Sequence, residues 1–274
     1  MKLNEERKQV TWRPLHSQHA IERVRLIVQF SEQIPVKVVR KMSEVLAAKR
    51  HETRMIGPAA LQGFGISMVH SEGGFVPQPQ QITNGWQFTR NASNNAPLET
   101  VVFDGTSITY ETTEYQRWDT FKRRTNKITA DVLQIASQSV DYQSVSVEYI
   151  DRFMYLGKAT EANVGDLLVN AGAMLHADAA TGKHLWHLHR GWFENFNGGK
   201  VLINQNFDAQ EGIVAGENAP TRSLQVLTKA ELRADSNDLS VEKYEENLEM
   251  LHDLTKSYFK DAIVKIQHEA LGLK

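Results

Sequence analysis

The chain has 274 residues, of which 41% are hydrophobic and 23% charged, a composition typical of a globular protein rather than a disordered one. It contains no cysteine, which excludes disulfides, thiolate nucleophiles and zinc sites with cysteine ligands. The first residues lack the apolar core of a signal peptide, and no segment has the length of a membrane span. We therefore expect a cytoplasmic protein with no membrane partner.

The small net charge of −2 is unevenly distributed along the chain. Residues 1–140 carry more Lys and Arg than Asp and Glu, and the remaining residues show the reverse. Such asymmetry can direct an acidic partner to the first part, or one copy of the molecule to another. It is also compatible with two solvated surfaces that have no partner.

In the first part of the chain, hydrophobic periodicity predicts a strand, a helix, four strands and a second helix. Ile21–Phe30 alternates apolar and polar residues, and Pro35 opens an amphipathic helix after it. Phe64–His70 and Gly85–Arg90 are expected as short strands joined by the loop SEGGFVPQPQQ. The Asp-Gly pair that begins at Asp104 indicates a hairpin. The apolar stripe of the second helix comprises Trp118, Phe121, Ile128 and Val132.

The second part of the chain repeats this order without repeating the sequence. Ser144–Tyr155 is expected as a strand, followed by a short helical piece at Asn163–Asn170. Ala173–Ala177 and His184–Phe193 are expected as strands on either side of a turn, and VLINQNF and SLQVLTKAEL as two more. A closing helix has an apolar stripe that includes Leu248, Leu251, Tyr258 and Ile263.

The predicted fold class is therefore α+β, with tandem duplicated β-α-β4-α units, antiparallel sheets and two long helices on one face. Antiparallel pairing follows because short hairpin turns cannot connect parallel neighbours. The predicted organisation is an N-terminal extension (residues 1–20), a first lobe (residues 21–140) and a second lobe (residues 141–274). Doubled in this way, the order looks like the saddle of the TATA-binding-protein fold and its helix-grip relatives.

Several segments also resemble a sporadically distributed family of uncharacterised bacterial proteins. They are IERVRLIVQF, GWQFT, VVFDGTSITY followed by YQRWDTFKRR, VSVEYIDRF and LHDLTKSYFKDAI, in that order. Members of that family usually open with Pro-Leu directly before the first strand, whereas HSQHA separates Pro14 and Leu15 from it here. The family has no established activity, so the resemblance implies neither a site nor a cofactor.

Four histidines form the one cluster in the sequence that suggests a metal site: His176, His184, His187 and His189. On a strand, His187 and His189 lie on the same face, a spacing that suits two imidazole ligands of one metal ion. His176 can approach across a hairpin as a third ligand. No carboxylate has the spacing expected of such a site, and the same pattern describes a half-exposed strand, which we favour. The alternative function is a metal-dependent hydrolase.

A basic run on the first long helix, together with two arginines of the first strand, is a candidate anion-binding or nucleic-acid-binding face. Its residues are Lys122, Arg123, Arg124, Lys127, Arg23 and Arg25. The sequence pI of about 6.6 is low for a nucleic-acid-binding protein. We favour a solvated helix face over a nucleic-acid-binding saddle.

No catalytic motif stands out, so the function that we favour is non-enzymatic. We expect a binding or accessory protein that acts through a protein or small-molecule partner, needs no cofactor and self-associates. An accessory or defence-type bacterial gene cluster is the setting that the scattered family suggests. Aromatic residues are the candidates for an interface between copies: Trp192, Phe193, Phe196 and Tyr244.

Overall fold

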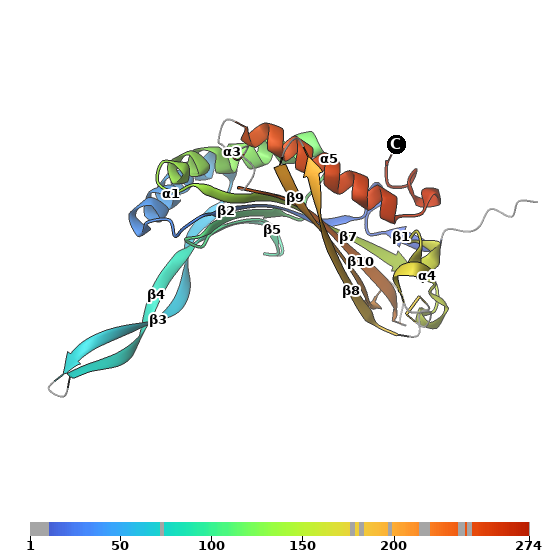
Figure 1. Ribbon diagram of the computed structural model, residues 1–274, viewed down its shortest axis with the longest axis horizontal. Coiled ribbons are helices and arrows are strands. Elements are labelled where there is room, and N and C mark those ends of the chain that lie inside the picture. The colour runs from blue at the N-terminus through green and yellow to red at the C-terminus, as the bar shows by residue number, and fades with distance from the viewer. Residues whose placement is uncertain are drawn as a thin grey trace, which may run out of the picture. The chain divides into compact units, whose positions relative to one another are not determined.

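The computed structural model describes residues 11–71, 74–175, 179–180, 184–196, 199–213, 220–234, 239 and 243–273. Within these ranges the side chains of residues 64–82, 84, 172 and 174 are not described. The described residues form an α+β protein with a large antiparallel sheet, so the coarse fold class is confirmed (Figure 1).

The first part of the chain has two strands and two helices, followed by four strands and a long helix. In order they are β1 (Trp12–Pro14), β2 (Ile21–Phe30), α1 (Val36–Ala48), α2 (Arg50–Thr53), β3 (Ile56–Ser71), β4 (Gly74–Asn91), β5 (Pro97–Phe103), β6 (Ser107–Thr112) and α3 (Trp118–Ser137).

The elements of the second part follow directly. In order they are β7 (Tyr142–Tyr155), two 3-10 turns (Ala159–Glu161 and Val164–Asp166), α4 (Ala171–Met174), β8 (Trp186–Phe196), β9 (Gly199–Gly212), β10 (Thr221–Arg233), α5 (Tyr244–Ala262) and a 3-10 turn (Lys265–Gln267).

The described strands hydrogen-bond in the order β3-β4-β5-β6-β2-β7-β10-β9-β8, and β1 pairs with β7. The chain divides into two compact units. One unit contains residues 25–146 and 232–248, and we call it the cleft unit because it contains the cleft described below. The other unit contains residues 1–24, 147–231 and 249–274, and we call it the second unit. The predicted division at residues 20 and 140 stays a prediction.

The core of the cleft unit forms where the apolar stripes of α1 and α3 meet the buried face of its strands. Alternate residues of β2 are buried, as the sequence predicts for a half-buried strand. In α3 the predicted stripe is buried, with Ile128 and Val132 each only 1% exposed. Phe121 of α3 lies 5.7 Å from Tyr110 of β6 between ring centroids and so joins the helix to the sheet. The helix side of this sheet is visible in Figure 1.

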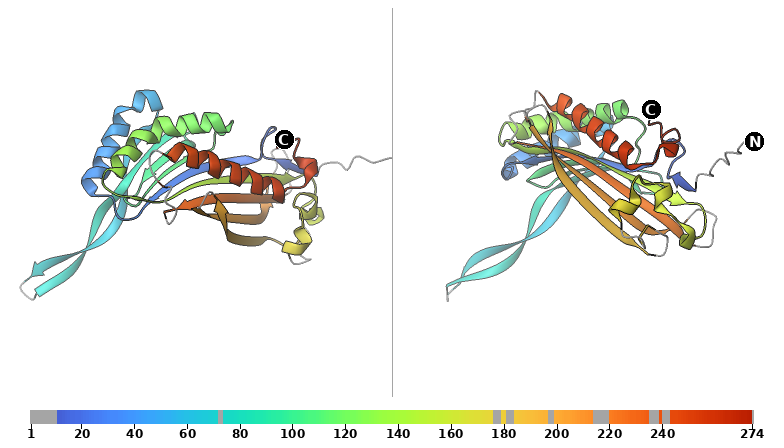
Figure 2. Two further views of the ribbon diagram at one scale, coloured as in Figure 1. Left: turned by 45° about the horizontal axis from the view of Figure 1, so that its top comes forward. Right: turned by 45° about the vertical axis from the view of Figure 1, so that its right-hand side comes forward.

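The predicted loop SEGGFVPQPQQ is wrong, because most of this segment is strand. β3 and β4 form one long hairpin, whose register runs from Ile56 opposite Thr89 to Ser71 opposite Gly74. β5 covers β4 only from Trp86 onward, so in the described residues the outer part of the hairpin is a two-stranded ribbon. Figures 1 and 2 show it extending away from the rest of its unit. The prolines of this segment led to the wrong prediction. Proline is tolerated in a strand where its own nitrogen faces away from a paired strand.

The core of the second unit gathers residues from both ends of the sequence. Trp12 of β1 is fully buried, and its Nε1 donates a hydrogen bond of 2.8 Å to the backbone oxygen of Asn163. Phe153 of β7 stacks on Phe259 of α5 at 6.4 Å between ring centroids. In the closing helix stripe Leu248, Leu251 and Ile263 are buried as predicted, whereas Tyr258 is only half-buried.

The expected strand at Ala173–Ala177 is also wrong at its start, because residues 171–174 form α4, and residues 176 and 177 lie outside the described residues. Asn170 has the left-handed conformation (φ 56°), which an asparagine tolerates, and the alanines that follow favour a helix. Among the described residues, three strands (β8, β9 and β10) therefore lie between α4 and α5, where the sequence predicts four. None of the helices in the described part of the chain has the length and apolarity that crossing a membrane requires.

The apolar stripe of α3 predicts that substitutions of its buried residues lower the stability of the protein more than substitutions of exposed residues on the same helix. Ile128 is buried, and its neighbour Lys127 is exposed on the same helix. We expect Ile128→Ala to lower the free energy of unfolding by about 2–5 kcal/mol, because it removes buried methyl groups and leaves a cavity. Lys127→Ala is the matched control and should change it by less than about 0.5 kcal/mol. Urea denaturation measures both, and equal effects would contradict the assignment of this face to the core.

Candidate functional site: an arginine-lined cleft

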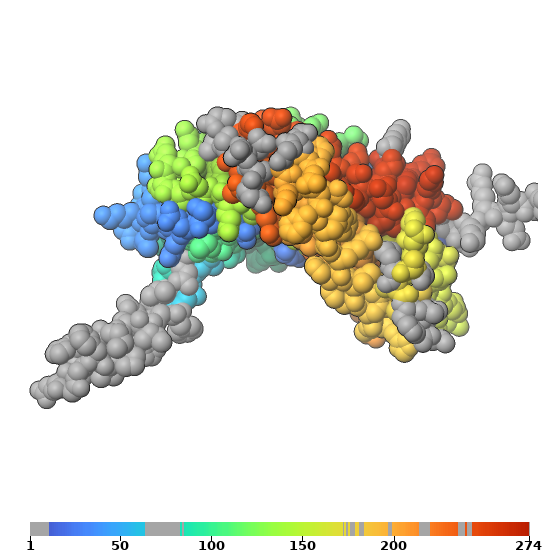
Figure 3. All heavy atoms as spheres, viewed as in Figure 1, coloured from blue at the N-terminus to red at the C-terminus, as the bar shows by residue number. Residues whose placement is uncertain are grey.

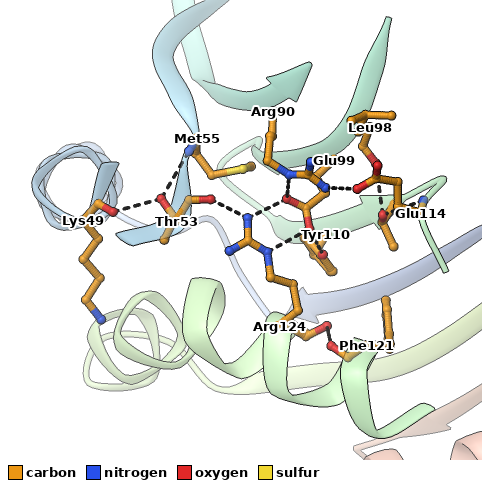
Figure 4. A network of polar contacts seen from close by, with 12 residues as sticks. Lys49, Thr53, Met55, Arg90, Leu98, Glu99, Tyr110, Glu114, Phe121 and Arg124 are labelled. Atoms are coloured by element: carbon orange, nitrogen blue, oxygen red, sulfur yellow. Dashed lines mark hydrogen bonds and ion pairs between the residues drawn. The ribbon is translucent and has the colours of Figure 1, made fainter. Parts of the chain in front are cut away.

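A cleft of about 390 Å³ opens on the cleft unit, between the strands β4, β5 and β6, the helix α3 and the segment after α2. Its inner wall is polar and comprises Arg90, Glu99, Tyr110 and Arg124. Its rim comprises Glu52, Arg54, Glu114, Gln116 and Thr120. Figure 4 shows the inner wall and its contacts.

The carboxylate of Glu99 is the centre of this wall. Glu99 occupies a core position of β5, in phase with the fully buried Val101 and Phe103, and is itself only 4% exposed. Arg124 donates to it in a fork, from Nε to Oε1 at 2.8 Å and from Nη2 to Oε2 at 2.6 Å. The Tyr110 hydroxyl donates to Oε1 at 2.8 Å. A buried carboxylate is tolerable only when it is paired in this way.

The second guanidinium group comes from the neighbouring strand. Arg90 of β4 is the direct register partner of Glu99, and its Nε donates to Oε2 at 2.5 Å. Its Nη2 donates to Glu114, whose side chain is 49% exposed at the rim. The Nη1 groups of Arg90 and Arg124 donate no hydrogen bond to any described residue.

Arg124 also fixes the chain between α2 and β3. Its Nη2 donates to the backbone oxygen of Thr53, which is buried. The Thr53 hydroxyl donates to the backbone oxygen of Lys49 at 3.0 Å and accepts from the backbone nitrogen of Met55 at 3.3 Å. The next residue, Arg54, has a left-handed backbone (φ 59°) and lines the cleft. Its exposed guanidinium makes no hydrogen bond or ion pair with the described residues.

The charges of the inner wall hold one another in their ionised forms. Burial by itself would raise the pKa of Glu99, but hydrogen bonds from Arg124, Arg90 and Tyr110 outweigh it and lower the pKa to about 2. The hydrogen bond to Glu99 raises the pKa of Arg124. Burial and the charge of Glu99 raise the pKa of the Tyr110 phenol. A general acid or base works best with a pKa near the working pH, so these groups suit binding rather than proton transfer.

The predicted anion-binding residues are not brought together as one face. Arg124 is half-buried against Glu99 instead of lying on a solvated helix face, because α3 turns it toward the sheet. Arg25 forms an ion pair with Glu111. Arg123 and Lys127 are exposed on α3, and the Nε of Arg123 donates to the backbone oxygen of Asp119 at 3.3 Å. Neither Lys122 nor Arg23 lines the cleft.

The histidine cluster lies partly outside the described residues, which exclude His176. His187 and His189 share the exposed face of β8, as predicted for a strand. Each hydrogen-bonds its register partner on β9, His187 with Asp208 and His189 with Asn206. His184 is exposed before β8. Within the described residues no three metal-ligating side chains come together, so the metal site stays a prediction.

The four candidate interface residues do not form one patch. Tyr244 is only 8% exposed because it belongs to the core of the cleft unit, so its assignment to a surface is wrong. Phe193 and Phe196 of β8 are exposed, at 58% and 36%. Trp192 points to the side of β8 opposite Phe193, and its ring meets Tyr258 of α5 at 5.2 Å between centroids. Figure 3 shows β8 in gold on the surface.

The sequence contains one signal that identifies the cleft in retrospect. In β5 the positions 99, 101 and 103 alternate with half-exposed residues, so a glutamate shares the phase of two core residues. A charged residue at a core position needs a partner, and Arg90 and Arg124 are the partners. No sequence spacing connects these three residues, since the pairing of β4 with β5 and the packing of α3 bring them together.

No protein-family model matches the chain, and no curated protein matches it. The resemblance to a scattered bacterial family and to the TATA-binding-protein fold therefore stays a prediction.

The buried carboxylate predicts a large loss of stability on its neutralisation. Glu99→Gln leaves Arg124 without its carboxylate partner and Arg90 with Glu114 alone. We expect the free energy of unfolding to fall by about 3–5 kcal/mol. Glu114→Gln makes the same change at a half-exposed carboxylate and should cost less than about 1 kcal/mol. Urea denaturation at neutral pH compares the two. Similar small losses in both variants would show that the Glu99 network contributes nothing to stability.

The low pKa of Glu99 predicts a pH window for this stabilisation. The folded-state pKa of about 2 lies below the ordinary value of 4.5, so the contribution of Glu99 is fully present above pH 4.5. It is lost as the pH falls from 4.5 through 2. The difference in unfolding free energy between the wild type and Glu99→Gln should therefore shrink across this window. A difference that is constant from neutral pH to acid would contradict the assigned ionisation.

Proposed function

We propose that this chain is a non-enzymatic binding protein, and that the arginine-lined cleft holds an anionic group of a small molecule or a protein partner. The observation that carries the proposal is the set of three guanidinium groups facing one cleft. Two of them are held rigidly by a buried carboxylate, and the third, Arg54, has no partner among the described residues. Arginine presents a planar fork of donors that matches carboxylate and phosphate oxygens.

Preorganisation is the physical reason that favours binding. An arginine on a surface loses side-chain freedom when it binds an anion, which weakens the complex. Arg90 and Arg124 have already lost that freedom to Glu99, and the Nη1 group of each donates to no described residue. Glu114 opposes an incoming anion because it carries the same charge and occupies Nη2 of Arg90. Among the charged residues of the rim, Arg54 therefore favours an anion, whereas Glu114 and Glu52 oppose it.

Small anions test the proposal directly. We expect citrate or inorganic phosphate to shift amide resonances around Thr53, Arg90, Glu99 and Arg124 in nuclear magnetic resonance titrations of the full chain. Arg54→Gln should weaken binding about tenfold, since one charge-assisted hydrogen bond is lost. Glu114→Gln should strengthen it, since a competing anion is removed. Arg123→Gln, the same charge change outside the cleft, should leave the affinity within about twofold.

Two outcomes would contradict the proposal. Resonance shifts confined to other surfaces would show that the cleft binds no anion. Equal weakening by Arg54→Gln and Arg123→Gln would show that only net charge matters.

We also propose that the two halves of the chain arose by tandem duplication, with α3 and α5 as the equivalent long helices on one face. Residues 21–137 follow the order β-α-β4-α apart from the additional short helix α2. Residues 142–262 follow a similar order, with three described strands (β8, β9 and β10) between α4 and α5. In each half the first strand lies beside the strand that precedes the long helix, β2 beside β6 and β7 beside β10.

A buried polar pair recurs at equivalent places and supports the duplication. On β9 the fully buried Gln205 accepts hydrogen bonds from Arg190, its direct register partner on β8. Its Nε2 donates to Thr228 on β10 at 3.4 Å and to the backbone oxygen of Tyr258 on α5 at 3.1 Å. Glu99 likewise contacts an arginine on the preceding strand, a hydroxyl on the following strand and the long helix.

In the second unit a neutral amide therefore stands where the cleft unit has a carboxylate. Gln205 accepts from one arginine, whereas Glu99 accepts from two. Under the duplication, Gln205→Glu would place a carboxylate equivalent to Glu99 beside Arg190, whose positive charge favours the ionised form of that carboxylate. A superposition of experimental structures of the two halves in which Glu99 and Gln205 do not coincide would contradict the shared origin.

A further inference from the structure

The outer part of the β3–β4 hairpin is a two-stranded ribbon, and such a ribbon is marginally stable in water by itself. Residues Gln62 to Ser71 of β3 pair only with residues Gly74 to Thr83 of β4 in the described chain. Ten residues of strand span roughly 33 Å. A third or fourth strand would stabilise a ribbon of this length.

The two edges of the ribbon differ in their ability to accept another strand. By register Pro77 lies opposite Met68, and Pro79 lies opposite Ile66. Proline occurs in a strand where its nitrogen faces away from a paired neighbour. At these two pairs the backbone N–H and C=O groups therefore face the outer edges of the ribbon. The outer edge of β4 lacks two N–H donors there, because both residues are proline. On the outer edge of β3, Ile66 and Met68 keep their N–H donors. The open edge is that of β3.

The base of the same edge is exposed and apolar. Ile56 at the start of β3 is 66% exposed, and residues 57–60, which are glycine, proline and two alanines, are exposed as well. β3 also stands at the end of the strand order. A long, proline-poor, apolar edge strand is a template for pairing with another chain.

The charge of this segment decides between classes of partner. Residues 55–89 contain no Lys, Arg or Asp, and their one acidic residue is Glu72. A nucleic acid would find no cation for its phosphates. A second copy would meet no charge repulsion, because antiparallel pairing across a two-fold axis places β3 against itself. The edge from Ala59 to Ser71 has 13 residues, which span roughly 43 Å, and a sheet is about 10 Å thick. Pairing along this edge therefore buries roughly 400 Å² per copy, an area that suits a weak, transient dimer.

We propose that β3 pairs with β3 of a second copy of this chain, antiparallel across a two-fold axis, so that two hairpins join into one four-stranded ribbon. Main-chain hydrogen bonds hold the dimer, and the exposed base of β3 adds apolar contact. This interface is independent of the arginine-lined cleft. It also differs from the aromatic residues of β8, which the sequence suggested for self-association.

Sedimentation velocity of the full chain between about 1 and 200 µM tests the dimer, because a weak interface has a micromolar dissociation constant. We expect the wild type to pass from monomer to dimer over this range. The double variant Ile66→Lys with Met68→Lys should stay monomeric, since two lysines on the edge oppose pairing. The control Gln78→Lys with Gln80→Lys adds the same charge to β4 and should still dimerise.

Hydrogen exchange of the wild type makes the test independent of how well the variants fold. The amides of Ile66 and Met68 should gain protection at least tenfold between the dilute and the concentrated sample, because pairing covers the edge. A wild type that stays monomeric at the highest concentration would overturn the proposal. So would a dimer that survives the edge lysines, or one that leaves these two amides unprotected.

Discussion

The buried carboxylate of Glu99 is the interaction on which the arrangement of the cleft unit depends. It joins three strands and a helix, because its partners come from β4, β6 and α3 while it stands on β5 itself. Through Arg124 it also fixes the backbone at Thr53. A carboxylate in an apolar core is costly unless it is paired. Removing one member of a buried ion pair is strongly destabilising, because the other charge then stays buried without its partner. The same pairing that holds these elements together leaves two rigid guanidinium groups facing solvent in the cleft.

Elements with strong local periodicity were predictable from the sequence. The alternation of β2, the Asp104 hairpin turn and the stripes of α3 and α5 all depend on contacts within one element or between neighbours in the chain. Asp104 illustrates the local nature of such signals, since its carboxylate accepts hydrogen bonds from the backbone of Thr106 and Ser107 and so closes the turn by itself.

Features that depend on distant partners were not predictable. In the sequence Glu99 is a single charged residue in a strand. Its partners, Arg90 on β4 and Arg124 on α3, are identified only by the fold. Pro77 and Pro79 suggest a loop in the sequence. Whether β4 tolerates them depends on which edge of the strand their nitrogens face, and the sequence does not show this. Tyr244 is a candidate interface aromatic in the sequence, whereas the packing of the cleft unit buries it. In each case the missing information is which residues become neighbours when the strands and helices pack.

A double-mutant cycle between Glu99 and Arg124 tests most directly whether this ion pair organises the cleft unit. The cycle compares Glu99→Gln, Arg124→Met and the double variant by urea denaturation at neutral pH. Residues that share one buried ion pair should be strongly coupled, so we expect a coupling energy above about 1.5 kcal/mol. Additive losses, with a coupling energy below about 0.5 kcal/mol, would show that the two residues act independently and would contradict the account.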